Sequence, residues 1–160
     1  MIRVAILGAS GFVGSELLRL CAGHPDFVPV ELFGDSQAGQ SLDAVHPHLA
    51  LVYPGLTVER FSPDSLDGID LVFAALPHGH SQAIAPEVIA RGIPIVDLGA
   101  DFRLNDAAAY EAWYHEPHQA PDPEALPCAA RMLVDQCRMP ELDVPAMQAA
   151  LDEAYRNNLY

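Results

Sequence analysis

Three glycines near the start of the chain constrain its fold more than any other feature. The stretch ILGASGFVGSELL places Gly8, Gly11 and Gly14 between an apolar run, Arg3–Leu7, and a segment with helical apolar spacing, Val13–Ala22. Such glycines allow a tight turn, close approach of a pyrophosphate to the backbone, and close packing of the helix on the strand. The helix N-terminus adds free N–H groups and a partial positive charge. The pattern predicts a strand–turn–helix unit that binds nucleotide phosphates, and a glycine-rich turn without a ligand is the alternative.

Beyond this unit, short apolar runs alternate with helical periodicity. We expect strands at Val28–Phe33, Thr57–Phe61, Asp70–Leu76 and Ile95–Leu98, helices at Gln82–Arg91 and from Asn105 to Ala112, and a turn-rich segment at Gly34–Pro54. Strands that alternate with helices over short connections predict right-handed βαβ units. Runs that are apolar throughout suit a sheet covered on both faces. The expected fold class is therefore α/β, with a Rossmann-like doubly wound parallel sheet.

The end of the chain has a different character. Pro-rich sequence runs to Pro127, and Asp143 then precedes an i, i+3, i+4, i+7, i+8 stripe from Met147 to Tyr155 that predicts a C-terminal amphipathic helix. The length of 160 residues suits one domain with a real core. We expect a nucleotide-binding domain over residues 1–118, and over residues 119–160 a connection and a helix that packs on the sheet or on a second subunit.

Charge narrows the choice of partners. The chain has 22 acidic residues against 8 Arg and no Lys, a net charge of −14. Such a surface repels nucleic acid and anionic membranes, so we expect neither as a partner. The absence of Lys excludes a P-loop lysine and a Schiff-base mechanism. Any anionic ligand must therefore be held by backbone amides or by a particular Arg.

Three features of the sequence favour a cytoplasmic location for the protein. No stretch reaches the roughly 20 apolar residues of a membrane span. The first residues enter a strand pattern with no signal-peptide core. The three Cys stand at unrelated spacings, which is not the pattern of a disulfide framework. A reducing, cytoplasmic location is expected.

The letters GDSQAG after the second predicted strand allow two interpretations. They resemble the start of a GDS-type serine hydrolase with Ser36 as the nucleophile, but the one Asp-x-x-His pair, Asp43–His46, follows too closely to supply a base from another loop. The end of the second strand, about 20 residues past the glycines, is also where the ribose of a dinucleotide binds. We therefore favour Ser36 as a cofactor contact and keep the hydrolase as an alternative.

Further blocks of sequence resemble one enzyme family. With the glycine loop, the segments SQAGQ, VHPHL, ALPHGHS (residues 75–81) and DLGADFRLNDAAAYEAWYHEPH (residues 97–118) resemble N-acetyl-γ-glutamyl-phosphate reductase of arginine biosynthesis. The resemblance covers residues 1 to about 118. It implies NADPH-dependent reduction of a small-molecule acyl phosphate to a semialdehyde, as aspartate-semialdehyde dehydrogenases perform, in an enzyme that could be a homo-oligomer.

The resemblance also implies roles for individual residues. Those implied for the cofactor are Gly8, Ser10, Gly11, Phe12, Val13 and Gly14 at the pyrophosphate, Asp35, Ser36, Ala38 and Gly39 at the adenosine ribose, and Leu76, Pro77 and His78 at the nicotinamide. Arg103 and Ser81 are implied as contacts of the substrate. The physical reason for Arg103 is that a guanidinium binds carboxylate or phosphate through two hydrogen bonds. An ion pair of Arg103 with Asp97 or Asp101 is the alternative.

The catalytic block of the family is missing. Family members use a Cys thiolate, which displaces phosphate and forms a thioester, in a P-G-C-Y-P-T-A block, with a His base elsewhere. Cys128 is the candidate counterpart, or a small buried hydrophobe, and Cys137 beside Arg138 could have a lowered pKa. The remaining residues leave no room for the family's second domain. We expect cofactor binding with little or no turnover, and a non-catalytic nucleotide-binding module is the alternative.

Two further patterns bear on ligands. Asp35 stands where family members often have Arg or a small residue, and Asp suits the ribose 2′-OH of NAD and repels a 2′-phosphate. NADP is thus the cofactor that the resemblance implies, and NAD stays open. The pairs His46/His48, His78/His80 and His115/His118 have metal-like spacing, but no Cys or carboxylate cluster completes a tetrahedral set. We expect loop hydrogen bonds from these histidines and no metal.

Overall fold

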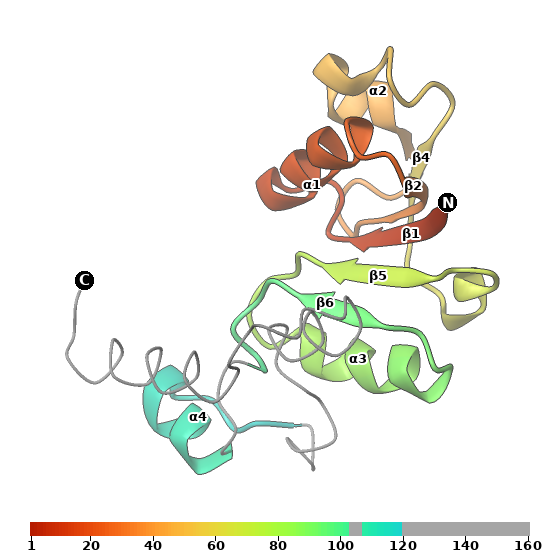
Figure 1. Ribbon diagram of the computed structural model, residues 1–160. Coiled ribbons are helices and arrows are strands. Elements are labelled where there is room, and N and C mark those ends of the chain that lie inside the picture. Colours follow the sequence, from red (N-terminus) through yellow and green to blue (C-terminus); the bar gives the residue numbers. More distant parts are fainter. Residues whose placement is uncertain (103–106, 120–160) are drawn as a thin grey trace.

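The structure is a computed structural model, and it describes residues 1–102 and 107–119 (Figure 1). The elements in chain order are β1 (Ile2–Leu7), α1 (Phe12–Ala22), β2 (Phe27–Phe33), β3 (Gln40–Ser41), α2 (Leu42–Val45), the 3-10 turn η1 (Pro47–Leu49), β4 (Thr57–Glu59), the 3-10 turn η2 (Pro63–Leu66), β5 (Leu71–Ala74), α3 (Ser81–Ala90), β6 (Ile95–Asp97) and α4 (Ala107–Tyr114). The expected C-terminal helix, Arg103, Cys128 and Cys137 lie outside the described residues.

The strands form one sheet in the order β3-β4-β2-β1-β5-β6. All neighbouring pairs are parallel except β3 with β4, which is antiparallel. The α/β prediction is confirmed, and the prediction of a parallel sheet is corrected to a mostly parallel one. The exception arises because the chain turns back at Gly39, whose φ is +87° and whose amide donates to the carbonyl of Val58 at 2.7 Å. That turn lays Gln40–Ser41 along the edge of β4 in the opposite direction.

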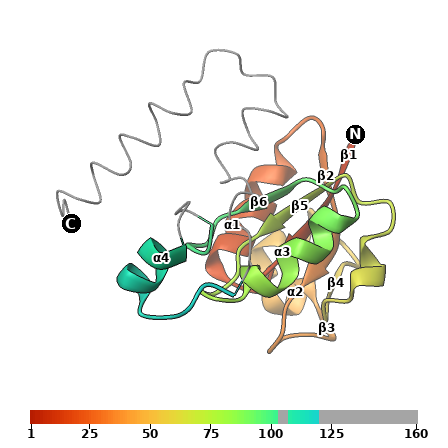
Figure 2. The same ribbon diagram turned by 90° about the horizontal axis from the view of Figure 1, so that it is seen from below.

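Helices cover both faces of the sheet, because alternate residues of β1 point to opposite sides. Val4 and Ile6 pack in one cluster with Leu18 of α1, while Ala5 and Leu7 pack in a second cluster with Val88 of α3. Figures 1 and 2 show α1 and α2 on one side of the strands and α3 on the other. A strand buried on both faces needs the continuous apolar run that β1 has.

The segment between β2 and β4 is more ordered than the sequence analysis expected. It contains β3, α2 and η1, where the sequence predicted only a turn-rich segment. Leu42 and Leu49 are buried and hold these short elements against the sheet. Each element is too short for its own periodicity to be visible in the sequence, and this explains the error.

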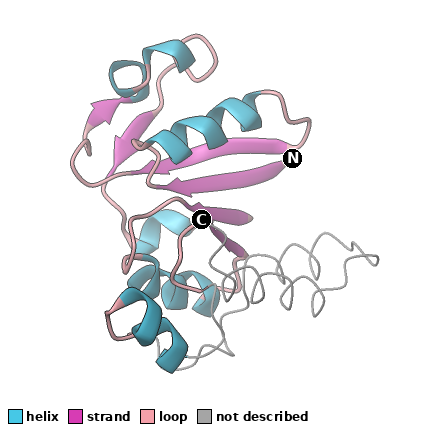
Figure 3. Ribbon diagram, turned by 90° about the vertical axis from the view of Figure 1, so that its left-hand side faces the viewer, coloured by secondary structure: helices cyan, strands magenta, loops and turns pink. Residues whose placement is uncertain are grey.

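The second face is completed by α3. Figure 1 shows this helix below β6, and Figure 3 shows helices (cyan) both above and below the strands (magenta). Pro86 lies inside it, and the helix ends at Ala90, followed by Gly92 with a φ of +71°. Glycine just past the last turn is the residue that takes this left-handed conformation at low cost. The predicted helix at Gln82–Arg91 is thus confirmed to within one residue at each end.

The described part of the chain, residues 1–102 and 107–119, has no helix with the length and apolar character needed to cross a membrane.

Candidate functional site

A cavity of about 490 Å³ lies at the carboxyl ends of β1, β2 and β5. These ends meet where the chain order of the sheet reverses, which is where open α/β sheets bind their ligands. The lining residues are Leu7, Gly8, Ser10, Gly11, Phe33, Gly34, Asp35, Ser36, Arg60, Phe61, Ala75, Leu76, Pro77, His80 and Ile84. They include residues predicted at all three parts of a dinucleotide, namely Gly8, Ser10, Gly11, Asp35, Ser36, Leu76 and Pro77.

The glycine loop fits tightly against its surroundings. Gly8 has a φ of +79°, and a Cβ there would lie 2.2 Å from the carbonyl oxygen of Ala75. The amides of Gly8 and Ala9 both donate to the carbonyl of Phe33 at 2.9 Å, which fixes the loop to the end of β2. A Cβ on Gly14 would lie 2.3 Å from the carbonyl oxygen of Gly8, so helix and loop touch. These close approaches leave no space for side chains and bring bare backbone to the cavity.

The start of α1 offers donors to an anion. Gly11 precedes the helix and makes no side-chain capping bond, and the amide of Ser15 donates to the carbonyl of Gly11 at 2.9 Å. The amides of the first turn have no acceptor within a helix and carry its partial positive charge. In a chain with a net charge of −14, this is a local site for a phosphate.

Two of the predicted pyrophosphate residues do not line the cavity. The Phe12 side chain is 97% exposed and that of Val13 is 49% exposed, and neither lines the cavity. Gly14 is buried and acts through packing. Contact of these three residues with a pyrophosphate stays a prediction.

The two histidines of the VHPHL segment form hydrogen bonds with the glycine loop and with α1. His46 is buried, and its Nε2 lies 2.8 Å from the carbonyl oxygen of Ala9, to which it donates. The Nε2 of His48 lies 3.1 Å from the hydroxyl of Ser15 in α1. Among residues 1–102 and 107–119, no three His, Cys, Asp or Glu side chains gather as a metal site would require. Sequence reasoning missed the contact with Ala9, because it joins segments far apart in the chain.

Replacing His46 with alanine should therefore weaken dinucleotide binding by about tenfold, the value of one buried hydrogen bond. The carbonyl of Ala9 would lose its donor, and the loop would lose a support. His48→Ala serves as the matched control, since its hydrogen bond with the hydroxyl of Ser15 is exposed to solvent and the effect should stay within about twofold. Calorimetric titration with NADPH measures both variants. Equal affinity in the two variants would contradict this account of His46.

At the end of β2, the structure separates the predicted ribose contacts. Asp35 and Ser36 line the cavity, whereas Ala38 and Gly39 form the turn that leads to β3 and do not line it. The amide of Ala38 donates to the carbonyl of Asp35 at 3.3 Å. Gly34 was not predicted, yet a Cβ there would lie 2.9 Å from the hydroxyl of Ser10, so this glycine brings β2 close to the loop.

A basic residue that sequence reasoning missed lies beside Asp35. Arg60 directly follows β4, and its guanidinium Nη1 lies 2.9 Å from the Asp35 carboxylate. Both residues line the cavity. A usable signal existed, because Arg60 lies near the carboxyl end of the predicted strand Thr57–Phe61, and the carboxyl ends of parallel strands meet at this edge of the sheet.

After β5, the cavity is bounded by Leu76, Pro77 and His80. His78, which the resemblance placed at the nicotinamide, does not line it. The His78 ring instead stacks on Tyr110 with a centroid distance of 5.5 Å, and its Nδ1 lies 3.3 Å from the Asp101 carboxylate. The structure thus brings His80 to the cavity wall, and His78 into a polar cluster beside it.

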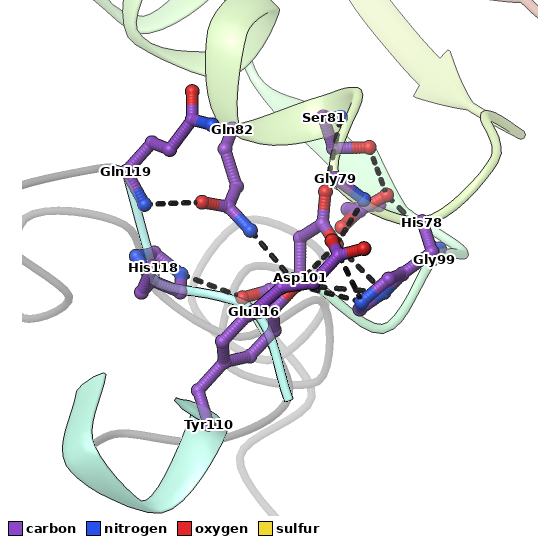
Figure 4. Close-up of polar contacts among 11 residues, drawn as sticks. His78, Gly79, Ser81, Gln82, Gly99, Asp101, Tyr110, Glu116, His118 and Gln119 are labelled. Atoms are coloured by element: carbon purple, nitrogen blue, oxygen red, sulfur yellow. Dashed lines mark hydrogen bonds and ion pairs between the residues drawn. The ribbon is translucent and has the colours of Figure 1, made fainter. Parts of the chain in front are cut away.

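Asp101 organises this cluster, as Figure 4 shows. Its side chain is 1% exposed and accepts hydrogen bonds from the amide of Gly79 at 2.9 Å, the amide of Ser81 at 3.1 Å and the hydroxyl of Tyr110 at 3.1 Å. Burial and the negative charge of Asp101 raise the pKa of Tyr110 above its usual value. Tyr110 therefore stays a neutral donor, and the loop after β5 is held by a carboxylate.

The hydroxyl of Ser81, which was predicted to contact the substrate, is engaged in a hydrogen bond within the structure. It is the first residue of α3, is buried, and its hydroxyl donates to the Asp97 carboxylate at 2.9 Å. It does not line the cavity. Ser81 joins the end of β6 to the start of α3, next to the amides that Asp101 binds.

Comparison with known proteins agrees with this geometry. A family model described as the semialdehyde dehydrogenase, NAD binding domain matches residues 3–150. N-acetyl-γ-glutamyl-phosphate reductase from Symbiobacterium thermophilum is 50% identical over 121 residues, which are 76% of this chain and 34% of that protein. The enzyme of the same name from Desulforudis audaxviator is 44% identical over 151 residues, 94% of this chain and 41% of that protein.

Among solved structures, aspartate semialdehyde dehydrogenase from Candida albicans, crystallised with NADP, superposes with a TM-score of 0.60 at 22% identity. The match covers 67% of this chain and 32% of that one, and it supports the fold. The chain spans only 34% to 41% of the two reductases described above. On the family match and the fold together, the chain belongs to the semialdehyde dehydrogenase family and comprises an NAD-binding domain of the type found in N-acetyl-γ-glutamyl-phosphate reductases.

Proposed function

We propose that this chain binds NADP(H) as the nucleotide-binding portion of an N-acetyl-γ-glutamyl-phosphate reductase. The observation that carries the proposal is the cavity itself, in which the glycine loop, the end of β2 and the loop after β5 meet. In that order they suit the pyrophosphate, the adenosine ribose and the nicotinamide. The relatives' reaction, with N-acetyl-γ-glutamyl phosphate as the substrate and a semialdehyde as the product, is proposed for the whole protein.

The residues fit the cofactor. Gly8 and Gly11 bring backbone to the cavity, and a Cβ at Gly8 would collide with Ala75. Bound NADPH would supply a hydride for reduction of an acyl group. The protein's part is to hold the nicotinamide beside the loop after β5, where Leu76 and Pro77 line the cavity.

The remaining assignments are proposals that rest on the resemblance. We propose Arg103 as the residue that grips the substrate anion and Cys128 as the candidate nucleophile, and we divide the chain into a domain at 1–118 and a tail at 119–160. A cytoplasmic setting suits the free buried thiol of Cys21, because such thiols persist under reducing conditions. Assembly as a homo-oligomer is proposed for the whole protein.

The serine hydrolase alternative gains no support from the described residues. The Nε2 of His46, the only His in an Asp-x-x-His pair, is engaged with the carbonyl of Ala9. Ser36 lies in the cavity next to Asp35 and Gly34, as a cofactor contact would.

Calorimetric titration of the full chain with NADPH and NADH tests the proposal. We expect saturable binding of at least one coenzyme. Addition of N-acetyl-γ-glutamyl phosphate to the NADPH complex, followed by absorbance at the nicotinamide band, should then show little or no oxidation. Binding without oxidation supports a nucleotide-binding portion, rapid oxidation would show that this chain carries the complete site, and absence of binding would refute the proposal.

A further inference from the structure

Arg60 and Asp35 stand side by side because their strands do. β2 and β4 are parallel neighbours, with Phe33 opposite Glu59 in the register. The amide of Gly34 donates to the carbonyl of Glu59 at 2.9 Å, so the two chain segments leave the sheet together. One segment brings a carboxylate to the rim of the cavity and the other brings a guanidinium, and the two groups lie 2.9 Å apart.

This ion pair is weak enough for a ligand to replace one of its partners. The side chains are 75% exposed for Arg60 and 87% exposed for Asp35. An ion pair in such a solvated position stabilises a protein little, because water screens the attraction and both side chains lose freedom. The guanidinium can therefore turn from the carboxylate to a more highly charged anion without a large loss.

Arg60 is also the sole Arg or Lys among the described residues that line the cavity. A 2′-phosphate on the adenosine ribose carries close to two negative charges and accepts paired hydrogen bonds from a guanidinium. Asp35 by itself would repel that phosphate and would accept a hydrogen bond from a ribose 2′-OH. The adjacent pair thus offers one partner for each of the two coenzymes.

We propose that Arg60 is the residue that binds the 2′-phosphate of NADP(H), and that Asp35 is its resting partner and the acceptor for the 2′-OH of NAD(H). The inference rests on the proposed dinucleotide site and adds its coenzyme selection. Asp35 alone would be expected to favour NAD(H). The neighbouring Arg60 changes this expectation, because its positive charge offsets the repulsion between Asp35 and the 2′-phosphate. The chain should bind both coenzymes, with NADPH no weaker than NADH.

The test compares NADPH and NADH affinities by calorimetry in the full chain and in three variants. Arg60→Ala should weaken NADPH binding by about 10- to 100-fold, the value of a hydrogen-bonded charge, and should leave NADH within about twofold. Asp35→Asn should weaken NADH and leave NADPH as tight or tighter. Arg19→Ala is the matched control, because it breaks another exposed ion pair, with Glu16 at 2.6 Å, on a helix and not at the cavity, and it should change neither affinity.

The outcomes separate the two proposals. If wild type binds a coenzyme but Arg60→Ala lowers both affinities equally or neither, the role of Arg60 is refuted while the dinucleotide site stands. If wild type binds neither coenzyme, both proposals fail. Thermal unfolding of each variant verifies folding, which exposed substitutions of this kind leave within about 0.5 kcal/mol. Arg60→Lys, which keeps the charge and loses the planar fork, should lose less NADPH affinity than Arg60→Ala.

Discussion

Substituting Gly14 with alanine is expected to abolish tight dinucleotide binding. The added Cβ would lie 2.3 Å from the carbonyl oxygen of Gly8 and 2.6 Å from the Cα of Ala9, and both are backbone atoms that cannot rotate away. The helix and the loop must move apart. We expect stability to fall by about 3 kcal/mol, typical of overpacking, and affinity for NADPH to fall on the order of 100-fold, the scale of a 1 Å misplacement.

Gly23→Ala is the matched control for this prediction. Gly23 follows α1 with a φ of −99°, and the nearest atom to its added Cβ is the carbonyl oxygen of Leu20 at 3.9 Å. Alanine fits there without strain, so binding and stability should match wild type. Chemical denaturation and calorimetry measure both variants. Wild-type affinity in Gly14→Ala would show that close contact between helix and loop is not needed for the site.

The second large effect is expected at Asp101. Asp101→Asn keeps the shape but turns an N–H donor toward the backbone donors of Gly79 or Ser81, which then lose a buried acceptor. We expect a loss of about 3 kcal/mol of stability, from one buried polar group left unpaired and a charged hydrogen bond removed. The loop after β5 bounds the cavity, so NADPH affinity should fall as well.

Asp67→Asn is the control for charge, since Asp67 is exposed at the end of η2. It makes the same change in net charge and should leave stability within about 0.5 kcal/mol of wild type. Urea denaturation of the two variants gives the comparison. Equal stability of the two would mean that the Asp101 cluster contributes no more than surface charge.

The sequence predicted the elements that carry strong local signals. Three local signals each specify a conformation that the structure has. They are the apolar run of β1, the glycines before α1, and Gly92, which follows the end of α3. The cavity follows from the same signals, because parallel strands in βαβ units bring their carboxyl ends to one edge. Gly8 and Asp35 both line this cavity, and their contact with a cofactor stays a prediction.

What the sequence could not show depends on contacts between distant segments. His46 reaches Ala9 across 37 positions, and His78 turns toward Asp101 while His80 takes the cavity wall. The choice between His78 and His80 depends on the direction of each side chain in a tight loop, which spacing does not determine. The place of Arg60 at the end of a strand was visible in the sequence, but its position beside Asp35 depends on the pairing of β4 with β2.

The proposed phosphate site depends most on the glycine loop and on the amides of the first turn of α1. Its most direct test is the ¹H–¹⁵N NMR spectrum of the full chain during titration with NADPH, which reports each backbone amide separately. The account predicts that the largest saturable shifts fall on the amides of Gly8 to Gly14, with the amide of Gly23 unchanged. Shifts that leave the Gly8–Gly14 amides in place, or a spectrum that NADPH does not alter, would contradict it.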